Sequence, residues 1–373
     1  MTVNGLLEFE RTIYWNAERG SIAPLDAMLG ILQDRYSAGV REMCCRLSLD
    51  SSFIPASENL QRTAQLSLSS TTIREIVETQ GRTACTQLQR GEAGPNWSAE
   101  DCSESTLITG ADGVMVPLVT EAQKAKCRQT QARKRKARGK KSTRRAGRPR
   151  KGSDGPYKEF KILAFYDTDK SHQYVTATSG NHQVLGRIMR REAAKVKLDK
   201  AEVKYSVTDG ADWIRKQYNQ QLPMLDENIL DYYHLREHVI TASYRVFGEG
   251  TAEALAWREE MMGLIWNDGP IRLLENLGQL RRSLRARSKI EALASLQNYV
   301  GKRMDMLDYP AFRAAGYDLG SGVTEAFCGT LTDRLKGPGM RWDKDNAEAM
   351  MALTSIYQSQ LWEDYWSKQR QAA

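Results

Sequence analysis

Three acidic residues have sequence surroundings that suit metal-dependent phosphodiester chemistry. Asp112 lies in a Val-, Ile- and Thr-rich run, Asp209 ends a similar run, and glycine follows each of them. Glycine lets a ligand approach the backbone closely. Glu325 follows two glycines and a serine in GSGVTE, where a helical pattern begins. Two adjacent carboxylates repel unless a cation lies between them, and magnesium takes oxygen ligands. A third carboxylate completes a two-metal site that activates one oxygen and stabilises another.

Other readings of these acids stay open on spacing alone. Asp-Gly is by itself a turn signal, so either aspartate can be structural. Asp167 and Asp169 in YDTDK are rival acids, which we expect in a hairpin turn. Asp212 is close to Asp209, but its place suits the N-terminal end of a helix.

The elements around these acids alternate in an informative order. Residues 106–119, 159–169 and 173–180 predict three consecutive strands. Helix 182–198, strand 201–210, helix 211–222 and strand 227–235 follow, and then the pattern is helical. Consecutive strands form an antiparallel meander, and strands reached through a helix add in parallel. We therefore predict an α/β fold with a mixed five-stranded sheet, as in the ribonuclease H architecture, in which the strands carrying Asp112 and Asp209 are neighbours.

The same patterns divide the chain into four regions. Residues 1–92 form a helical N-terminal domain, and 93–234 form the first part of the catalytic domain. A helical insertion covers 235–315, and 316–373 complete the catalytic domain. Within the first region, two helices flank a short turn, with Ser69 or Ser70 as the cap of the second. This layout fits a DNA-reading helix-turn-helix, although an ordinary helical hairpin has the same pattern.

Positive charge is concentrated in one segment. The net charge is +8, and residues 124–151 hold 15 of the 54 Lys and Arg residues and no acid. The remaining 39 basic residues face 46 acidic ones, so the rest of the chain is at −7. Such a segment indicates a polyanion contact, and its polarity predicts a loop over 124–156.

Within and after this loop, particular side chains are candidates for DNA contact. Gly147-Arg148-Pro149 resembles an AT-hook core, which fits a narrow minor groove, and the alternative is a sequence-neutral phosphate clamp. Trp342 can stack on an unpaired base or pack in the core. The predicted DNA-contacting residues are Arg133, Lys134, Arg135, Lys136, Arg144, Arg145, Arg148, Arg150, Lys151, Arg334, Lys336, Arg341 and Trp342.

Composition excludes several classes of protein. Hydrophobic residues make up 41% of the 373, which is enough for a sizeable core. No uncharged apolar run is long enough for a membrane helix, and acids interrupt the N-terminal stretch where a signal peptide is apolar. We therefore expect a soluble cytoplasmic protein. The six cysteines form no CxxC pair and do not cluster with histidine in the sequence, so we expect reduced thiols and no zinc site.

Four motifs, VTDGADWI, LDYYHLREH, GSGVTEAFC and DRLKGPGMRWDKDNAEAMMAL, resemble mutator-like bacterial insertion-sequence transposases of the ISKra group. The resemblance covers about 107–353, and the last two motifs are the most specific. It implies a ribonuclease H-like fold with a helical insertion and a catalytic set of Asp112, Asp209 and Glu325 that binds Mg²⁺, with Mn²⁺ as a substitute. Related transposases carry a Cys-or-Asp-x-x-His motif, which Asp231 and His234 match.

The resemblance also implies an activity. We expect a DNA transposase in which water cuts the transposon ends and the freed 3′ hydroxyl attacks target DNA. Pairing two ends implies a homodimer or larger assembly, on DNA in a prokaryotic nucleoid. His234 would support the site by bonding the scissile phosphate or a carboxylate, although a lone histidine is usually a core residue. The alternatives are a nuclease that does not join strands and a transposase-derived DNA-binding protein without catalysis.

Overall fold

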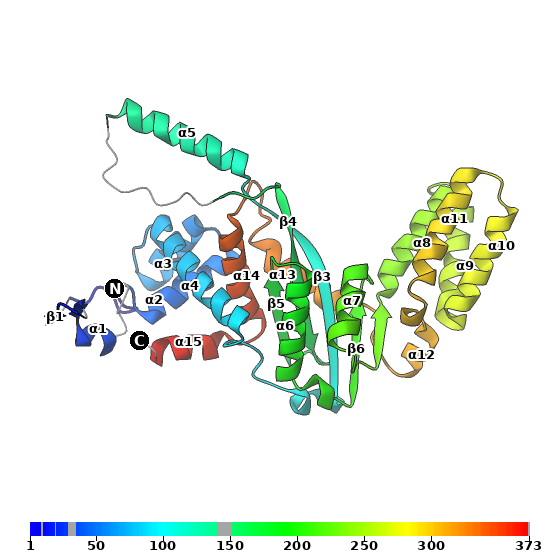
Figure 1. Ribbon diagram of the computed structural model, residues 1–373, viewed down its shortest axis with the longest axis horizontal. Helices are drawn as coiled ribbons and strands as arrows, with labels where there is room; N and C mark the ends of the chain where they lie inside the picture. Colours follow the sequence, from blue (N-terminus) through cyan, green and yellow to red (C-terminus); the bar gives the residue numbers. More distant parts are fainter. Residues whose placement is uncertain (9, 19, 29–34, 140–150, 372–373) are drawn as a thin grey trace.

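The centre of the molecule is a mixed five-stranded sheet (Figure 1). The computed structural model describes residues 1–8, 10–18, 20–28, 35–139 and 151–371. The strand order is β5-β4-β3-β6-β7, antiparallel from β3 through β5 and parallel from β3 through β7. This is the ribonuclease H-like arrangement that the sequence predicts. The strands are β3 (Thr106–Pro117), β4 (Tyr157–Tyr166), β5 (Gln173–Thr178), β6 (Val203–Thr208) and β7 (Glu227–Leu230).

Helices cover both faces of this sheet. On one face α6 (His182–Lys195) packs on β4 and on α7 (Asp212–Gln221). On the other, α13 (Gly322–Asp333) packs on β3 and β4, and α14 (Lys344–Gln358) packs on β5. Successive side chains along each strand point to opposite faces of the sheet. The acids that belong to the α13 face therefore have to come from alternate positions of β3.

The N-terminal helices join the sheet through α14. α4 (Ser70–Arg90) packs along α14 and against α2 (Ala38–Asp50) and α3 (Phe53–Ala64). The contact with α14 is close, because a side chain at Gly81 would meet the Ala349 backbone at 2.6 Å. Ser69 accepts from the Thr72 N–H at the start of α4, so the predicted cap is confirmed. The helix pair exists as predicted, and its reading of DNA stays a prediction.

The region after β7 is a helical group that extends away from the sheet (Figure 1). The prediction of a strand over 227–235 is wrong beyond Leu230, because Asp231 caps a helix there and its side chain accepts from the His234 N–H. The helices of this group are α8 (Tyr232–Phe247), α9 (Ala252–Asp268), α10 (Pro270–Ser283), α11 (Arg287–Gly301) and α12 (Tyr309–Ala314).

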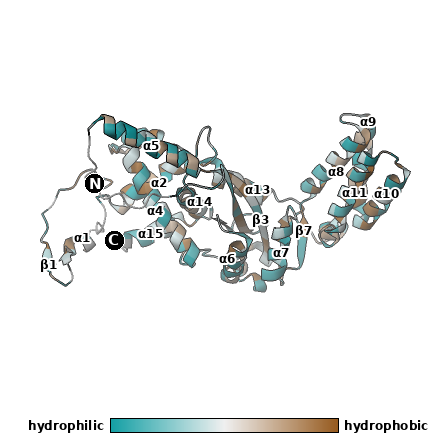
Figure 2. Cartoon of the chain, turned by 45° about the horizontal axis from the view of Figure 1, so that its top comes forward, coloured by the Kyte–Doolittle hydropathy of each residue, from teal (hydrophilic) through white to brown (hydrophobic). Residues whose placement is uncertain are grey.

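The basic segment begins as a helix, so the prediction of a loop is wrong for its first part. α5 (Glu121–Ala137) projects from the body, has no buried residue and is largely hydrophilic (Figure 2). It lacks the apolar stripe that marks most helices, but Thr120 and Gln123 form a capping box, and Ala, Gln, Lys and Arg are good helix formers. The structure describes nothing of residues 140–150, where the AT-hook-like sequence and Arg144, Arg145, Arg148 and Arg150 lie.

Short elements complete the described chain. A two-stranded hairpin near the N-terminus has every strand residue exposed, which adds a small sheet to the predicted helical region. Within the described residues, no helix is both long and apolar enough to cross a membrane. The remaining elements are β1 (Tyr14–Asn16), β2 (Gly20–Ile22), α1 (Pro24–Met28), η1 (Ala99–Asp101), η2 (Ser103–Ser105), η3 (Leu198–Lys200), η4 (Met304–Met306) and α15 (Trp362–Gln371).

A glycine sets how closely α13 sits on the sheet. A Cβ at Gly110 of β3 would lie 1.9 Å from Oγ1 of Thr324, in the first turn of α13. Both residues lie in the buried interior, so neither can move aside into solvent. The absence of a side chain at Gly110 therefore brings the N-terminal turn of α13 against β3.

We expect Gly110→Ala to destabilise the protein by about 1–3 kcal/mol, because the added methyl group overpacks this contact. Gly329→Ala is the control on α13 itself, since a Cβ there meets nothing within 4 Å. An alanine inside a helix should stabilise it by roughly 0.5–1 kcal/mol. Chemical denaturation of the two variants measures both effects, and equal stability would show that α13 is not held as described.

Candidate active site

Asp112 and Asp209 are brought to the same level by the register of two strands. β3 and β6 pair in parallel with Thr109 opposite Ser206. Three residues further along each chain come Asp112 and Asp209. Asp209 directly follows the last residue of β6, and the chain turns there, with Gly210 in the left-handed region at φ +67°. The predicted pairing of the two aspartates on neighbouring strands is therefore what the sheet provides.

Asp112 faces α13. It is two positions from Gly110 on β3, so both lie on the same face of the sheet. The Sγ of Cys328 on α13 lies 3.4 Å from Asp112 Oδ2 and donates to it, and the Gly113 N–H donates to Oδ1 at 2.5 Å. Asp112 is half-buried, which leaves part of its carboxylate open to solvent.

Glu325 lies one helical turn before Cys328 on the same helix. Its side chain is exposed, and Ser321 Oγ donates to its Oε1 at 3.0 Å. Burial raises the pKa of Asp112, and the negative charges of Asp209 and Glu325 raise it further. Hydrogen bonds from Gly113 and Cys328 act in the opposite direction. Asp209 and Glu325 thus both lie near enough to Asp112 for their charges to act on it.

This group suits a hard divalent cation. All its donors are carboxylate oxygens, which magnesium prefers. Among the described residues no Lys or Arg forms an ion pair with Asp112, Asp209 or Glu325. Their oxygens are not all within 4.8 Å of one another. Mutual repulsion opposes closer approach of three anions, and a cation between them removes that cost.

Asp231 connects the helical insertion to the helix that bears Glu325. It is 2% exposed; one oxygen accepts from the His234 N–H at 2.8 Å, and the other accepts from the Ser321 N–H. The Tyr232 N–H adds a bond to the Leu319 carbonyl at 2.9 Å. These bonds fix the start of α8 against the loop before α13. The aspartate of the Asp-x-x-His motif therefore has a structural role that its sequence context did not reveal.

His234 is not where the sequence analysis expects it. It lies in the first turn of α8 rather than at a strand end, because the helix begins directly after Asp231. Its Nδ1 is 3.9 Å from Glu237, and its ring is 5.2 Å from that of His238. Neither neighbour is one of the three acids. A role for His234 at a phosphate stays a prediction.

The insertion supplies contacts to the Asp209 loop that sequence reasoning missed. Tyr299 Oη donates to the Asp209 carbonyl at 3.5 Å, and Arg303 Nε donates to the Gly210 carbonyl at 2.9 Å. The Arg303 guanidinium lies 4.1 Å from the centre of the Tyr299 ring, and His238 stacks on its ring at 3.7 Å. Burial lowers the pKa of His238, and its neighbours His234 and Arg303 lower it further. No local motif marks these residues, since about ninety positions separate them from Asp209.

Of the residues predicted to contact DNA, those that the structure describes are either exposed or buried. Arg133, Lys134, Arg135 and Lys136 are exposed on α5, and Lys151, Lys336 and Arg341 are exposed elsewhere. Lys336 lies close enough to the site to oppose the rise that burial and Asp112 cause in the pKa of Cys328.

The predictions for Arg334 and Trp342 are not supported, because both side chains are buried. The Arg334 guanidinium lies 5.1 Å from the ring centres of Phe53 and Trp342, and its Nε donates to the Ser48 carbonyl at 3.2 Å. Burial lowers its pKa. Trp342 packs edge-on against Phe53 and is 8% exposed. This cluster holds the N-terminal helices against the loop after α13, so the core reading of Trp342 is the correct one.

The sheet order and its helices define a ribonuclease H-like α/β fold, with Asp112 and Asp209 at the same level of two neighbouring strands. No protein-family model matches the chain, and no curated protein matches it. Among solved structures, the chain is similar to one described as a Drosophila P element transposase strand transfer complex. The two share 11% identity over 89% of this chain and 94% of that one, with a TM-score of 0.40. That similarity is too low to assign a family.

We expect Mg²⁺ or Mn²⁺ to raise the unfolding temperature of the wild-type protein but not of Asp209→Asn. Metal at about tenfold its Kd should add about 1.4 kcal/mol. Without metal, Asp209→Asn should be at least as stable as wild type, because it removes repulsion from Asp112. Asp199→Asn, at an exposed acid on η3, is the control and should respond to metal like wild type. Equal metal responses in Asp209→Asn and wild type would contradict the site.

Proposed function

We propose that this chain is a DNA transposase with a two-metal active site built from Asp112, Asp209 and Glu325. The observation that carries the proposal is that Asp112 faces α13, the helix that bears Glu325, at the level at which Asp209 follows the neighbouring strand. The resemblance of the four motifs to ISKra-group transposases supports it, since it implies these three acids as the catalytic set. Bound at these oxygens, Mg²⁺ would make an attacking oxygen more nucleophilic and stabilise the charge on the leaving oxygen.

The chain's own residues would position the site and the substrate. Asp231 accepts from the Ser321 N–H, and Ser321 Oγ donates to Glu325, so these two bonds would fix the Glu325 carboxylate. Tyr299 and Arg303 would fix the backbone of the turn that carries Asp209. Lys336 would attract a phosphate beside the acids. DNA ends would lie along α5 and Arg341, and a homodimer or larger assembly would pair two ends in a prokaryotic nucleoid.

The helix α5 would bind DNA by neutralising phosphates. Its cations have few acidic partners: Arg128 contacts Glu121, and Lys124 is 2.7 Å from Asp343. Near its C-terminal end Arg133, Lys134, Arg135 and Lys136 stand together and exposed. Cations at the C-terminal end of a helix interact favourably with its dipole, so these residues would stabilise α5 itself and remain available to DNA.

Cleavage and joining test the enzyme. The substrate is a plasmid carrying the coding region with its native flanking DNA, and a second plasmid serves as target. With Mg²⁺ we expect wild type to cut at the flanks and to join the 3′ ends to the target. Asp209→Asn should cut at least about 10³-fold more slowly, a loss of about 4 kcal/mol of transition-state stabilisation. Asp199→Asn should retain activity. Equal cutting by Asp209→Asn and wild type would refute the mechanism, and cutting without joining would make the protein a nuclease.

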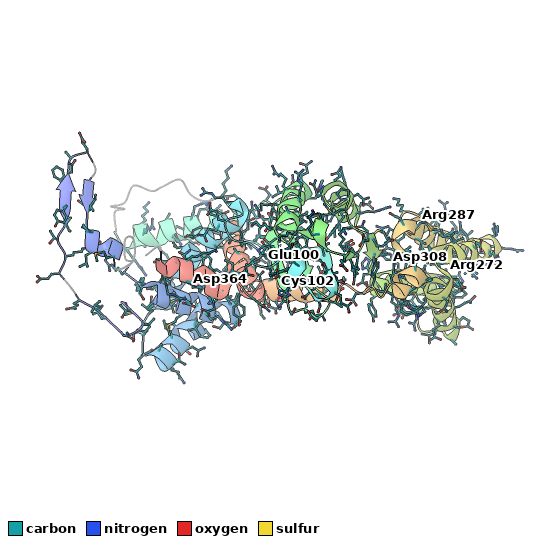
Figure 3. All side chains as sticks on the ribbon, turned by 90° about the horizontal axis from the view of Figure 1, so that it is seen from below. Glu100, Cys102, Arg272, Arg287, Asp308 and Asp364 are labelled. Carbon is teal, nitrogen blue, oxygen red and sulfur yellow. The ribbon has the colours of Figure 1, made fainter. Side chains whose placement is uncertain are left out.

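A salt titration tests α5. Replacing Arg133, Lys134, Arg135 and Lys136 by alanine should reduce the slope of log K against log salt by roughly 3–4, if each contacts one phosphate. Arg272→Ala with Arg287→Ala is the control, since these cations pair with Glu275 and Glu291 at the far end of the insertion (Figure 3). An unchanged slope in the α5 variant would exclude this helix from the DNA interface.

A further inference from the structure

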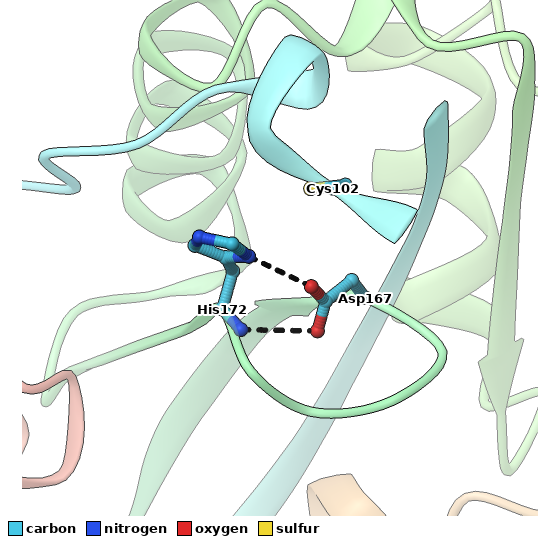
Figure 4. A group of neighbouring side chains, drawn as sticks. All are labelled: Cys102, Asp167 and His172. Atoms are coloured by element: carbon cyan, nitrogen blue, oxygen red, sulfur yellow. Dashed lines mark hydrogen bonds and ion pairs between the residues drawn. The ribbon is translucent and has the colours of Figure 1, made fainter. Parts of the chain in front are cut away.

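A second group of ligating side chains lies where β4 ends. Cys102 stands between η1 and η2 just before β3, Asp167 directly follows β4, and His172 directly precedes β5. One ligand atom from each lies within 4.8 Å of the other two (Figure 4). Among the described residues this is the one such group of three or more His, Cys, Asp or Glu. In three dimensions a cysteine therefore lies beside a histidine, although the sequence shows no such cluster.

Burial distinguishes this group from surface acids. Asp167 is fully buried and Cys102 is 7% exposed, while the His172 side chain is 30% exposed. A carboxylate removed from water needs a cation or several hydrogen bonds. In the described part of the chain, Asp167 pairs with no Lys or Arg; its bonds come from His172 Nδ1 at 2.8 Å, the His172 N–H at 3.1 Å and Ser171 Oγ at 2.8 Å. Asp101 and Asp169 add negative charge nearby.

We propose that Cys102, Asp167 and His172 bind a zinc-class divalent cation. One thiolate, one imidazole and one carboxylate make up a donor set that zinc accepts and magnesium does not. A water molecule would be the fourth ligand. The site is separate from the three acids of the proposed active site, so it does not depend on the proposed function.

Binding requires a small rearrangement and the release of protons. The Cys102 thiol must lose its proton, and His172 must carry its remaining proton on Nε2 so that the Nδ1 lone pair faces the metal. The hydrogen bond between Nδ1 and Asp167 is then replaced by two metal bonds. Tetrahedral geometry places the two ligand atoms, His172 Nδ1 and the Asp167 oxygen, roughly 3.3 Å apart. Their present distance of 2.8 Å therefore has to increase by about 0.5 Å. Side-chain rotation of His172 can supply this movement.

A metal here would join three chain segments at the same end of strands β3, β4 and β5. The turn before β3, the end of β4 and the start of β5 all meet at it. The Trp97 ring lies 5.6 Å from His172 and covers one side of the group. The cation would therefore stabilise the start of the strand that later carries Asp112, without touching that acid.

Metal analysis of the purified full chain tests the site. After exposure to zinc chloride and removal of excess, we expect about one zinc per chain in wild type and none in Cys102→Ser or His172→Gln. Cys127→Ser is the matched control, because Cys127 is exposed on α5. The double variant Asp112→Asn, Asp209→Asn should keep its zinc, which would show that this site is separate from the three acids. Absence of zinc from wild type would overturn the proposal.

Cobalt substitution keeps the test valid if the variants fail to fold. Cobalt chloride added to wild type should produce a sulfur-to-cobalt charge-transfer band, since Cys102 would be a direct ligand. The band should persist in Cys127→Ser. If it is missing from wild type, or if it disappears in Cys127→Ser, Asp167 and His172 form only a hydrogen-bonded pair and the proposal fails.

Discussion

The parallel pairing of β3 with β6 is the constraint on which the rest of the site depends. Because side chains alternate along a strand, a shift of one residue in this register would turn Asp112 to the opposite face. With Thr109 opposite Ser206, Asp112 reaches the level of Asp209 and points toward α13. Gly110 then allows Thr324 to approach, and Glu325 follows Thr324 on the helix. One register thus places an acid from a strand, an acid from a turn and an acid from a helix together.

The helical insertion is coupled to this arrangement at both of its ends. At its start, Asp231 binds the backbone of α8 and that of the loop before α13. Toward its end, Tyr299 and Arg303 bind the carbonyls of Asp209 and Gly210. A displacement of the insertion would therefore move the supports of two of the three acids. This connection gives the insertion a physical means of acting on the proposed active site, in addition to whatever surface it offers to DNA.

Local patterns in the sequence were enough for the sheet and its order, because each strand has β-branched residues and because β4, β5 and β6 end at polar turns. The sequence pattern placed the start of the helix after Asp231 too late, since a four-residue strand runs directly into its cap. α5 has no apolar stripe, so the local signals for a helix are its capping box and the helix propensity of its residues. Arg334 packs on Phe53, and Cys102 meets His172, across separations that no single-sequence pattern reports. Pairwise contacts between distant segments depend on the tertiary fold, so they became visible only in the structure.

A site made of three acids repels the polyanion on which we propose it acts. The chain outside residues 124–151 has a net charge of −7, so attraction has to come from the basic segment. β3 links the two directly: it carries Asp112, ends at Pro117, and leads through Thr120 into α5. The base of α5 is further held by a bridge between Leu118 and Trp342 and by the ion pair of Lys124 with Asp343. DNA bound to α5 would therefore be held by the same rigid strand that positions the first acid. In this arrangement the DNA-binding helix and the three acids lie apart, and β3 connects them.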